Sequence, residues 1–396
     1  MIVLRRLVVA TVIIAALEGL KWIIAGSAPA TKIFVSQFLL CAQVVVVIWL
    51  VITAILSAFG KGSSWVARFL PVILILLVIS IDMWFNYLIN RPARIPGGLL
   101  PSFTRYYDRF ERNDLKFEPC TVYDSISGPR IIPGLRFAFG NIEYRNQYNI
   151  NRESLRDNDG DLFGSQIICL GNTFTLGCGV EEEQTFAELL ARRSQKTVVN
   201  MGVTDQRTED QFDYLPAADT SVLEYLVLQL SYPDTYEEVI PGRDAESRPE
   251  TYDEFELKRR QYGWSKEYFP GKYSVSILAD WIASTVSQKR NKLTISPVEY
   301  AKHTVDFLAK TRQGVRYKII ITQVDEYARM NTGLVNSIDS ILRLPQYDSL
   351  VSQVHTLDLS GVLKREDYYV LDKHLKAEGH VKVAGQLWNK LAELEK

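Results

Sequence analysis

Ile167-Ile-Cys-Leu-Gly-Asn-Thr-Phe-Thr-Leu-Gly-Cys-Gly-Val180 is the stretch that decides the fold of this chain. It begins as an apolar strand and runs into a tight turn. A hydroxyl residue, Thr173, lies at the tip of that turn. Near the end of the chain, Asp372-Lys-His374 supplies a carboxylate and an imidazole two residues apart. A hydroxyl, a base and an acid are the parts of a nucleophilic hydrolase or acyltransferase.

Patterns typical of strands and helices alternate from this stretch onward. Helices are expected over 185–193 and 377–395, with further helices between 250 and 315. The expected strands are 166–170, 197–201, 224–230, 316–323 and 354–359. Such alternation predicts an α/β fold with a parallel sheet covered on both faces. Because sites in these sheets form at the C-terminal ends of strands, Thr173 follows its strand at the expected place.

The first ninety residues are mostly apolar, unlike the rest of the chain. Three runs are long enough to cross a bilayer as helices: 7–25, 33–59 and 69–89. From residue 91 onward the composition is that of a soluble segment. The sequence therefore predicts a three-helix transmembrane region over 1–90, an irregular lead-in that wraps the main domain over 91–160, and the α/β domain over 161–396.

A cleaved signal peptide is the alternative for the first apolar run. Arg5 and Arg6 would form its charged start, and Ala28-Pro-Ala30 its cleavage site. The length of the run, and the charges of Glu18 and Lys21 within it, favour a retained helix. The distribution of Lys and Arg slightly favours a cytoplasmic N-terminus. The large C-terminal part would then lie outside the cytoplasm, in the periplasm of a Gram-negative cell.

Three charged residues lie inside the apolar runs, where a charge is costly: Glu18, Lys21 and Asp82. Lys21 follows Glu18 by three residues, so the two lie on one helix face and can pair. Glu18 and Asp82 either lie near the membrane interface or face partner helices, in this chain or in another subunit. The expected partners are therefore the lipid bilayer and other membrane-protein subunits.

The overall composition excludes several classes of function. The formal net charge is −1 and no charged block stands out, so nucleic acid is not an expected partner. Four cysteines are too few for a disulfide framework, although a single bridge between Cys169 and Cys178 stays open. His374 and His380 are near each other but form no ligand motif. No metal and no cofactor are predicted.

Four blocks of the sequence resemble those of the SGNH/GDSL hydrolase superfamily, in particular its membrane-attached bacterial members. Gly171-Asn-Thr173 stands where the family usually has Gly-Asp-Ser, and Asn200-Met-Gly-Val203 is similar to the second block. Leu228-Gln-Leu-Ser-Tyr-Pro-Asp234 resembles the third block, and Asp372-Lys-His374 the last. The preceding segment, Tyr148–Asp157, looks like the family's lead-in to its first block.

The resemblance implies a flavodoxin-like, three-layer α/β domain and an acyl-enzyme mechanism. Thr173 would attack the acyl carbonyl, His374 would accept its proton, and Asp372 would orient the imidazole. The resemblance also implies a multi-pass protein of the bacterial inner membrane, with the main domain periplasmic or otherwise extracytoplasmic. An acyl ester or a cell-envelope glycan is the substrate that it implies.

Several positions depart from the family's pattern. Thr173 replaces a serine and adds a methyl group that restricts χ1. Asn172 replaces an aspartate that is mainly structural. Asp205 stands at the position of an oxyanion-hole glycine, where a carboxylate would repel the developing oxyanion. Pro233 stands at the position of a donor asparagine, and it has neither an N–H nor an amide. Losing one such donor typically lowers the rate by roughly 10²–10³.

Two functions follow from these observations. The departures favour a catalytically degenerate, membrane-anchored protein that serves as a binding or structural subunit of a membrane assembly. The alternative is an extracytoplasmic ester hydrolase or O-acyltransferase that acts on a cell-envelope glycan through Thr173, His374 and Asp372. A carbohydrate-binding module is a third hypothesis, resting on five aromatic residues that could stack on sugars: Tyr262, Trp264, Tyr268, Tyr273 and Trp281.

Overall fold

The computed structural model describes residues 65–124, 128–204, 208–232, 251–267, 271–286, 295–312 and 314–396, with isolated positions between 12 and 58. Contacts divide the chain into two compact units. The larger unit comprises Asn113–Tyr252 and Arg290–Lys396, and the smaller one comprises Met1–Arg112 and Asp253–Lys289. These boundaries differ from the predicted divisions after residues 90 and 160. The reason is that α4 (Leu100–Phe110) packs on α9 (Lys272–Val286), which follows much later in the chain.

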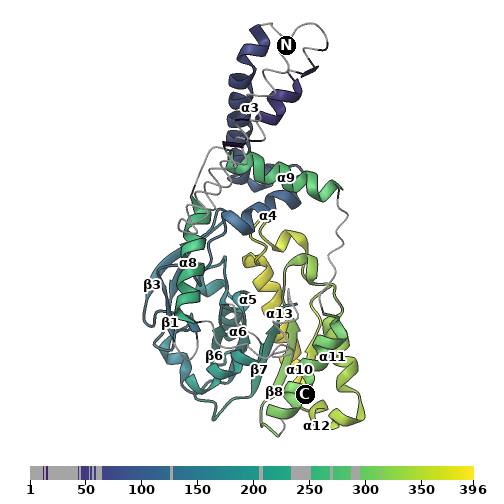
Figure 1. Ribbon diagram of the computed structural model, residues 1–396. Coiled ribbons are helices and arrows are strands. Elements are labelled where there is room, and N and C mark those ends of the chain that lie inside the picture. Colours follow the sequence, from purple (N-terminus) through teal and green to yellow (C-terminus); the bar gives the residue numbers. More distant parts are fainter. Residues whose placement is uncertain are drawn as a thin grey trace. The chain divides into compact units, whose positions relative to one another are not determined.

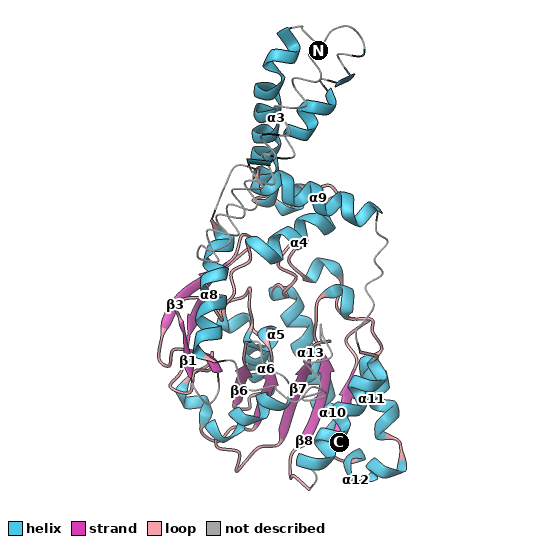
Figure 2. Ribbon diagram, viewed as in Figure 1, coloured by secondary structure: helices cyan, strands magenta, loops and turns pink. Residues whose placement is uncertain are grey.

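A five-stranded parallel sheet forms the centre of the larger unit (Figure 2). Its spatial order, β6-β5-β7-β8-β9, is the flavodoxin-like order. The strands are β5 (Ile167–Gly171), β6 (Val198–Gly202), β7 (Tyr225–Leu230), β8 (Lys318–Gln323) and β9 (Val354–Leu357). The predicted parallel sheet is confirmed, and each expected strand is present with small shifts at its ends.

Helices pack on both faces of this sheet, which makes the predicted three layers. Side chains at alternate positions of β5 enter two separate cores. Ile168 and Leu170 join the core that contains α10 (Pro297–Thr311) and α11 (Leu334–Leu342). Ile167 and Cys169 join the core that contains α6 (Phe186–Ser194) and α13 (Ala377–Leu394). Burial on both faces explains why β5, β6 and β7 are nearly continuous apolar runs.

The segment before β5 has more regular structure than its composition indicates. It forms two antiparallel hairpins, β1 (Thr121–Asp124) with β2 (Gly128–Ile131) and β3 (Arg136–Gly140) with β4 (Arg145–Asn149). Phe139 and Tyr148 of the second hairpin pack with Leu176, at the end of the short helix after β5, and with Cys178. This pairing depends on distant contacts rather than on local periodicity, so the sequence pattern did not indicate it.

The smaller unit contains α3 (Trp65–Ile89), α4, most of α8 (Tyr252–Lys266) and α9 (Figure 1). The predicted run 69–89 falls within α3. The runs 7–25 and 33–59, with Glu18 and Lys21, lie outside the described residues apart from isolated positions. Among the helices that the structure describes, none combines the length and the apolar character needed to cross a membrane.

Asp82 of α3 caps another helix of the same unit. Its side chain is 1% exposed, and its carboxylate accepts hydrogen bonds from the N–H groups of Gly271 at 3.2 Å and Ser274 at 2.8 Å. These amides lie at the start of α9, where a negative charge is favourable. Asp82 was expected either near the membrane interface or facing a partner helix. In the structure it faces α9, a helix of its own chain.

Candidate active site

The turn after β5 places Thr173 at the C-terminal end of the sheet. Asn172 caps the short helix α5 (Thr173–Leu176), because its side-chain oxygen accepts the N–H of Phe174 at 3.0 Å. Its amide nitrogen donates to the hydroxyl of Ser231 at 2.8 Å. Asn172 thus performs the capping role of a carboxylate. As the first residue of α5, Thr173 has an N–H without an acceptor inside the helix, so this N–H can serve as a donor.

The structure brings together the three residues expected to carry the chemistry. His374 Nε2 lies 2.9 Å from Thr173 Oγ1, although 201 residues separate them. His374 Nδ1 hydrogen-bonds to Asp372 Oδ1. Asp372 is 1% exposed and His374 is 5% exposed. The ring of Phe174 packs against the imidazole with 5.1 Å between centroids. This is the geometry of a nucleophile, a base and an orienting acid.

The residue between acid and base has an unusual backbone conformation. Lys373 has φ of 69°, which residues other than glycine rarely adopt. Its ammonium lies 3.2 Å from the carboxylate of Glu326, in the loop after β8. This ion pair ties the segment that carries Asp372 and His374 to the same edge of the sheet as Thr173. Such local strain is typical of functional sites.

The two positions expected to have lost oxyanion donors, Asp205 and Pro233, lie outside the described residues. Nearby, the N–H of Gly202 donates to Asn200 at 2.9 Å and the N–H of Val203 donates to the carbonyl of Gly171 at 3.0 Å. These two amides are already used. A Cβ at Gly202 would lie 2.0 Å from the backbone nitrogen of Leu176, so the close approach of α5 requires this glycine.

Arg156 supports the candidate site, although no sequence motif singles it out. This arginine is 1% exposed, and its guanidinium lies 3.7 Å from the centroid of the Tyr148 ring. It donates to four backbone carbonyls, those of Gln147, Leu176, Gly177 and Val180, at 2.7 to 3.2 Å. Arg156 therefore joins the β3–β4 hairpin to the loop that follows α5. No local pattern distinguishes it from a surface arginine.

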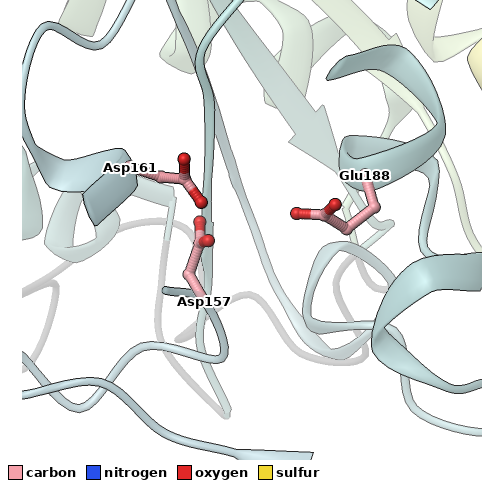
Figure 3. A group of neighbouring side chains, drawn as sticks. All are labelled: Asp157, Asp161 and Glu188. Carbon is pink, nitrogen blue, oxygen red and sulfur yellow. The ribbon is translucent and has the colours of Figure 1, made fainter. Parts of the chain in front are cut away.

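Three carboxylates that the sequence did not indicate as a group lie close together (Figure 3). Ligand atoms of Asp157, Asp161 and Glu188 are within 4.8 Å of one another. Burial, together with the charges of Asp161 and Glu188, raises the pKa of Asp157 to about 8, against the hydrogen bonds from the N–H groups of Asn200 and Asn158. Burial also raises the pKa of Glu188. A proton held by Asp157 at neutral pH relieves the repulsion within the group.

His380 lies near His374 in sequence but has a structural role. Its Nδ1 accepts the N–H of Phe186 at 3.1 Å, and its ring stacks on the ring of Phe186. Burial, with smaller contributions from the charges of Arg156 and His374, lowers the pKa of His380 to about 3. His380 is therefore neutral in the folded protein across the physiological range.

The buried neutral state of His380 predicts a loss of stability in acid. Its folded pKa of about 3 lies below the ordinary value of 6.5, so below pH 6.5 only the unfolded chain takes up the proton. The contribution of neutral His380 to the free energy of unfolding is therefore complete above pH 6.5, and it falls by about 1.4 kcal/mol per pH unit below about pH 6. His380→Asn keeps an acceptor for the N–H of Phe186 without titrating. In urea unfolding from pH 7.5 to 4.5, the free energy of unfolding should fall more steeply for the wild type than for this variant. A difference between the two proteins that is constant with pH would contradict the buried neutral state of His380.

The remaining candidates do not form a second site among the described residues. Cys169 and Cys178 are not joined by a disulfide. Tyr273 is 8% exposed and packs against Tyr106, whereas Trp281 is 42% exposed. Tyr268 lies outside the described residues. Of the described members of this group, Tyr273 is therefore too buried to stack on a sugar.

No protein family model matches the chain, and no curated protein matches it. Solved structures of similar fold include three with 13 to 14% sequence identity. A protein assigned to the lipolytic G-D-S-L family, from Desulfitobacterium hafniense DCB-2, has a TM-score of 0.31 and 13% identity, over 56% of this chain and 97% of that one. A Corynascus thermopiles (Myceliophthora fergusii) carbohydrate esterase family 2 enzyme with a carbohydrate-binding domain has a TM-score of 0.35 and 13% identity, over 58% and 66%. A carbohydrate esterase with catalytic and non-catalytic binding functions at its active site has a TM-score of 0.32 and 14% identity, over 58% and 65%. This chain thus spans just under two thirds of the last two proteins.

Proposed function

We propose that this protein transfers or hydrolyses acyl esters through Thr173, His374 and Asp372. The observation that carries the proposal is the 2.9 Å contact between His374 Nε2 and Thr173 Oγ1, with Asp372 buried behind the imidazole. In the forward step, Thr173 Oγ1 bonds to the acyl carbon while its proton passes to His374 Nε2. The protonated imidazole then gives this proton to the leaving alkoxide, and water or an acceptor hydroxyl releases the acyl group.

The threonine is compatible with this chemistry. Its methyl group restricts χ1, and its hydroxyl already points toward the base. The N–H of Thr173 is one oxyanion donor in the proposed mechanism. The amides of Gly202 and Val203 are bonded to protein groups, so neither is a second donor in the proposed mechanism.

A second candidate function is that of a degenerate binding or structural subunit. Pro233 supports it, because proline at the position of a donor asparagine supplies neither an N–H nor an amide. Asp205 also supports it, because a carboxylate at the position of an oxyanion-hole glycine would repel the developing oxyanion. In that case the contact of Thr173 with His374 would persist as an internally satisfied polar pair without turnover.

The experiment that separates the two candidates is the trapping of an acyl-enzyme. The full-length protein is mixed with an aryl acetate, quenched in acid and digested. The active hydrolase should yield an acetylated peptide containing Thr173 in the wild type and none in Thr173→Ala. A protein that turns over the ester without acetylating this peptide, or that shows neither, would contradict the proposed mechanism.

Attachment to a membrane is the second part of the proposal. The apolar runs 7–25 and 33–59 support it, as do the basic residues at their ends. We place the main domain on the extracytoplasmic side, where a glycan ester of the cell envelope would be its substrate. Washing membranes at alkaline pH tests the attachment, since release of the protein into the supernatant would contradict it.

A further inference from the structure

The turn between β3 and β4 reaches the acid of the candidate triad from 231 residues away in sequence. The side-chain nitrogen of Asn141 donates to Asp372 Oδ2 at 2.9 Å, and the hydroxyl of Tyr144 lies 3.4 Å from the same oxygen. The other oxygen of Asp372 is engaged by His374 Nδ1. Because Asp372 is 1% exposed, these donors replace the water that would otherwise solvate its second oxygen.

The same turn also holds the backbone that carries the acid. The carboxylate of Glu143 accepts the N–H groups of three consecutive residues, Val370 at 2.8 Å, Leu371 at 2.6 Å and Asp372 at 2.9 Å. Hydrogen bonds to a charged acceptor are roughly twice as strong as those between neutral groups. One short turn therefore engages both the side chain and the main chain of Asp372.

We propose that Asn141 and Glu143 are positioning residues of the triad, so that the β3–β4 turn belongs to the active site. Asn141 holds Asp372 Oδ2, which leaves Oδ1 directed at the imidazole. Glu143 fixes the main chain at Asp372, two residues before His374. Neither residue touches the reacting atoms, and both act through the acid. The inference rests on the proposed function, because positioning is defined by the step in which His374 takes the proton of Thr173.

The physical reason for such support is the sensitivity of proton transfer to geometry. When His374 becomes positively charged, the carboxylate of Asp372 must already face it. A misplacement of about 1 Å in such an arrangement lowers the rate on the order of 10²-fold. In this proposal the four hydrogen bonds from Asn141 and Glu143 hold Asp372 in the orientation that the step requires.

Asn141→Asp is the sharpest test, because it replaces one donor group with an oxygen of similar size. At neutral pH a second carboxylate beside Asp372 repels it, and kcat should fall about 10²-fold with little change in KM. In acid the introduced carboxyl gains a proton and again donates to Asp372. The ratio of variant to wild-type kcat should therefore rise as pH falls, and a ratio that is constant with pH would overturn the proposal.

The other titratable groups around Asp372 are present in both proteins, and kcat is corrected for the titration of His374 in each protein separately, because the added charge shifts it. They are His374, Tyr144, Tyr369 and Glu143. A second variant, Glu143→Gln, turns an acceptor into a donor that must face a backbone N–H. It should lower kcat about 10-fold at unchanged KM. The matched control is Glu182→Gln, since Glu182 accepts one bond from Asn149 on β4 of the same hairpin and touches no triad residue.

A readout independent of turnover separates this proposal from the proposed function. The imidazole resonances of His374 are followed by NMR across a pH titration in the wild type, Asn141→Asp and Glu182→Gln. The added negative charge of Asn141→Asp should move the titration of His374 to higher pH, and Glu182→Gln should leave it in place. Failure of the wild type to turn over, with this shift present, would reject the hydrolase and with it the positioning role, and would leave only the contact of Asn141 with Asp372. Turnover without the shift would reject the positioning alone.

Discussion

His374→Ala is expected to lower kcat for aryl-acetate hydrolysis by about 10⁴-fold, with Thr173→Ala giving a loss of the same size. The imidazole is the only base within hydrogen-bond distance of Thr173 Oγ1 among the described residues, at 2.9 Å. Without it the hydroxyl keeps its proton and is a poor nucleophile. The measurement is steady-state hydrolysis by the full-length protein, with each variant's folding checked by circular dichroism.

Two further variants make this prediction specific. Because the residues act as a unit, Thr173→Ala combined with His374→Ala should be no slower than either single variant. Thr173→Ser removes only the methyl group and should retain activity within about 10-fold of the wild type. His303→Ala is the control, because His303 pairs with Glu209 on another part of the unit. Equal rates in wild type and His374→Ala would reject the proposed mechanism.

Arg156→Ala is expected to destabilise the larger unit by about 4 kcal/mol. The change leaves four backbone carbonyls without their shared donor and removes the stack on Tyr148. For a unit of this size the loss corresponds to a fall in Tm of roughly 10 °C. The loop after α5 follows Thr173 directly, so activity should fall even at temperatures where the variant stays folded. Urea unfolding and differential scanning calorimetry measure the two effects.

Two further variants show whether Arg156 stabilises the unit through the shape of its guanidinium or through its positive charge. Arg156→Lys keeps the positive charge but lacks the planar fork that reaches four carbonyls, so most of the destabilisation should remain. Arg152→Ala removes an exposed arginine four residues earlier, which pairs with the exposed Glu153 and lies 5.1 Å from the centroid of the exposed Phe163 ring. It should change stability by less than about 0.5 kcal/mol. A loss in Arg152→Ala as large as in Arg156→Ala would show that the buried network is not the cause.

The sequence by itself determined the parallel sheet and pointed to the three residues of the candidate site. Strands such as β5 are buried on both faces, and this leaves apolar runs that are readable without any distant contact. Thr173, Asp372 and His374 were found because each lies in a short local motif. The site then required only that the C-terminal end of β5 and the last loop meet, as a parallel sheet of this order allows.

Only the tertiary structure decided what supports that site. Asn141, Glu143 and Arg156 lie in a segment without clear periodicity, and their partners named above are 9 to 231 residues away. The sequence shows Asp82 only as a charge in an apolar run, and the structure shows that its carboxylate caps α9. Hydrogen bonds of this kind depend on distance and direction between elements that are remote in the chain. A polar residue has the same local pattern whether it is solvated at the surface or buried against backbone groups, so its role appears only once the chain has folded.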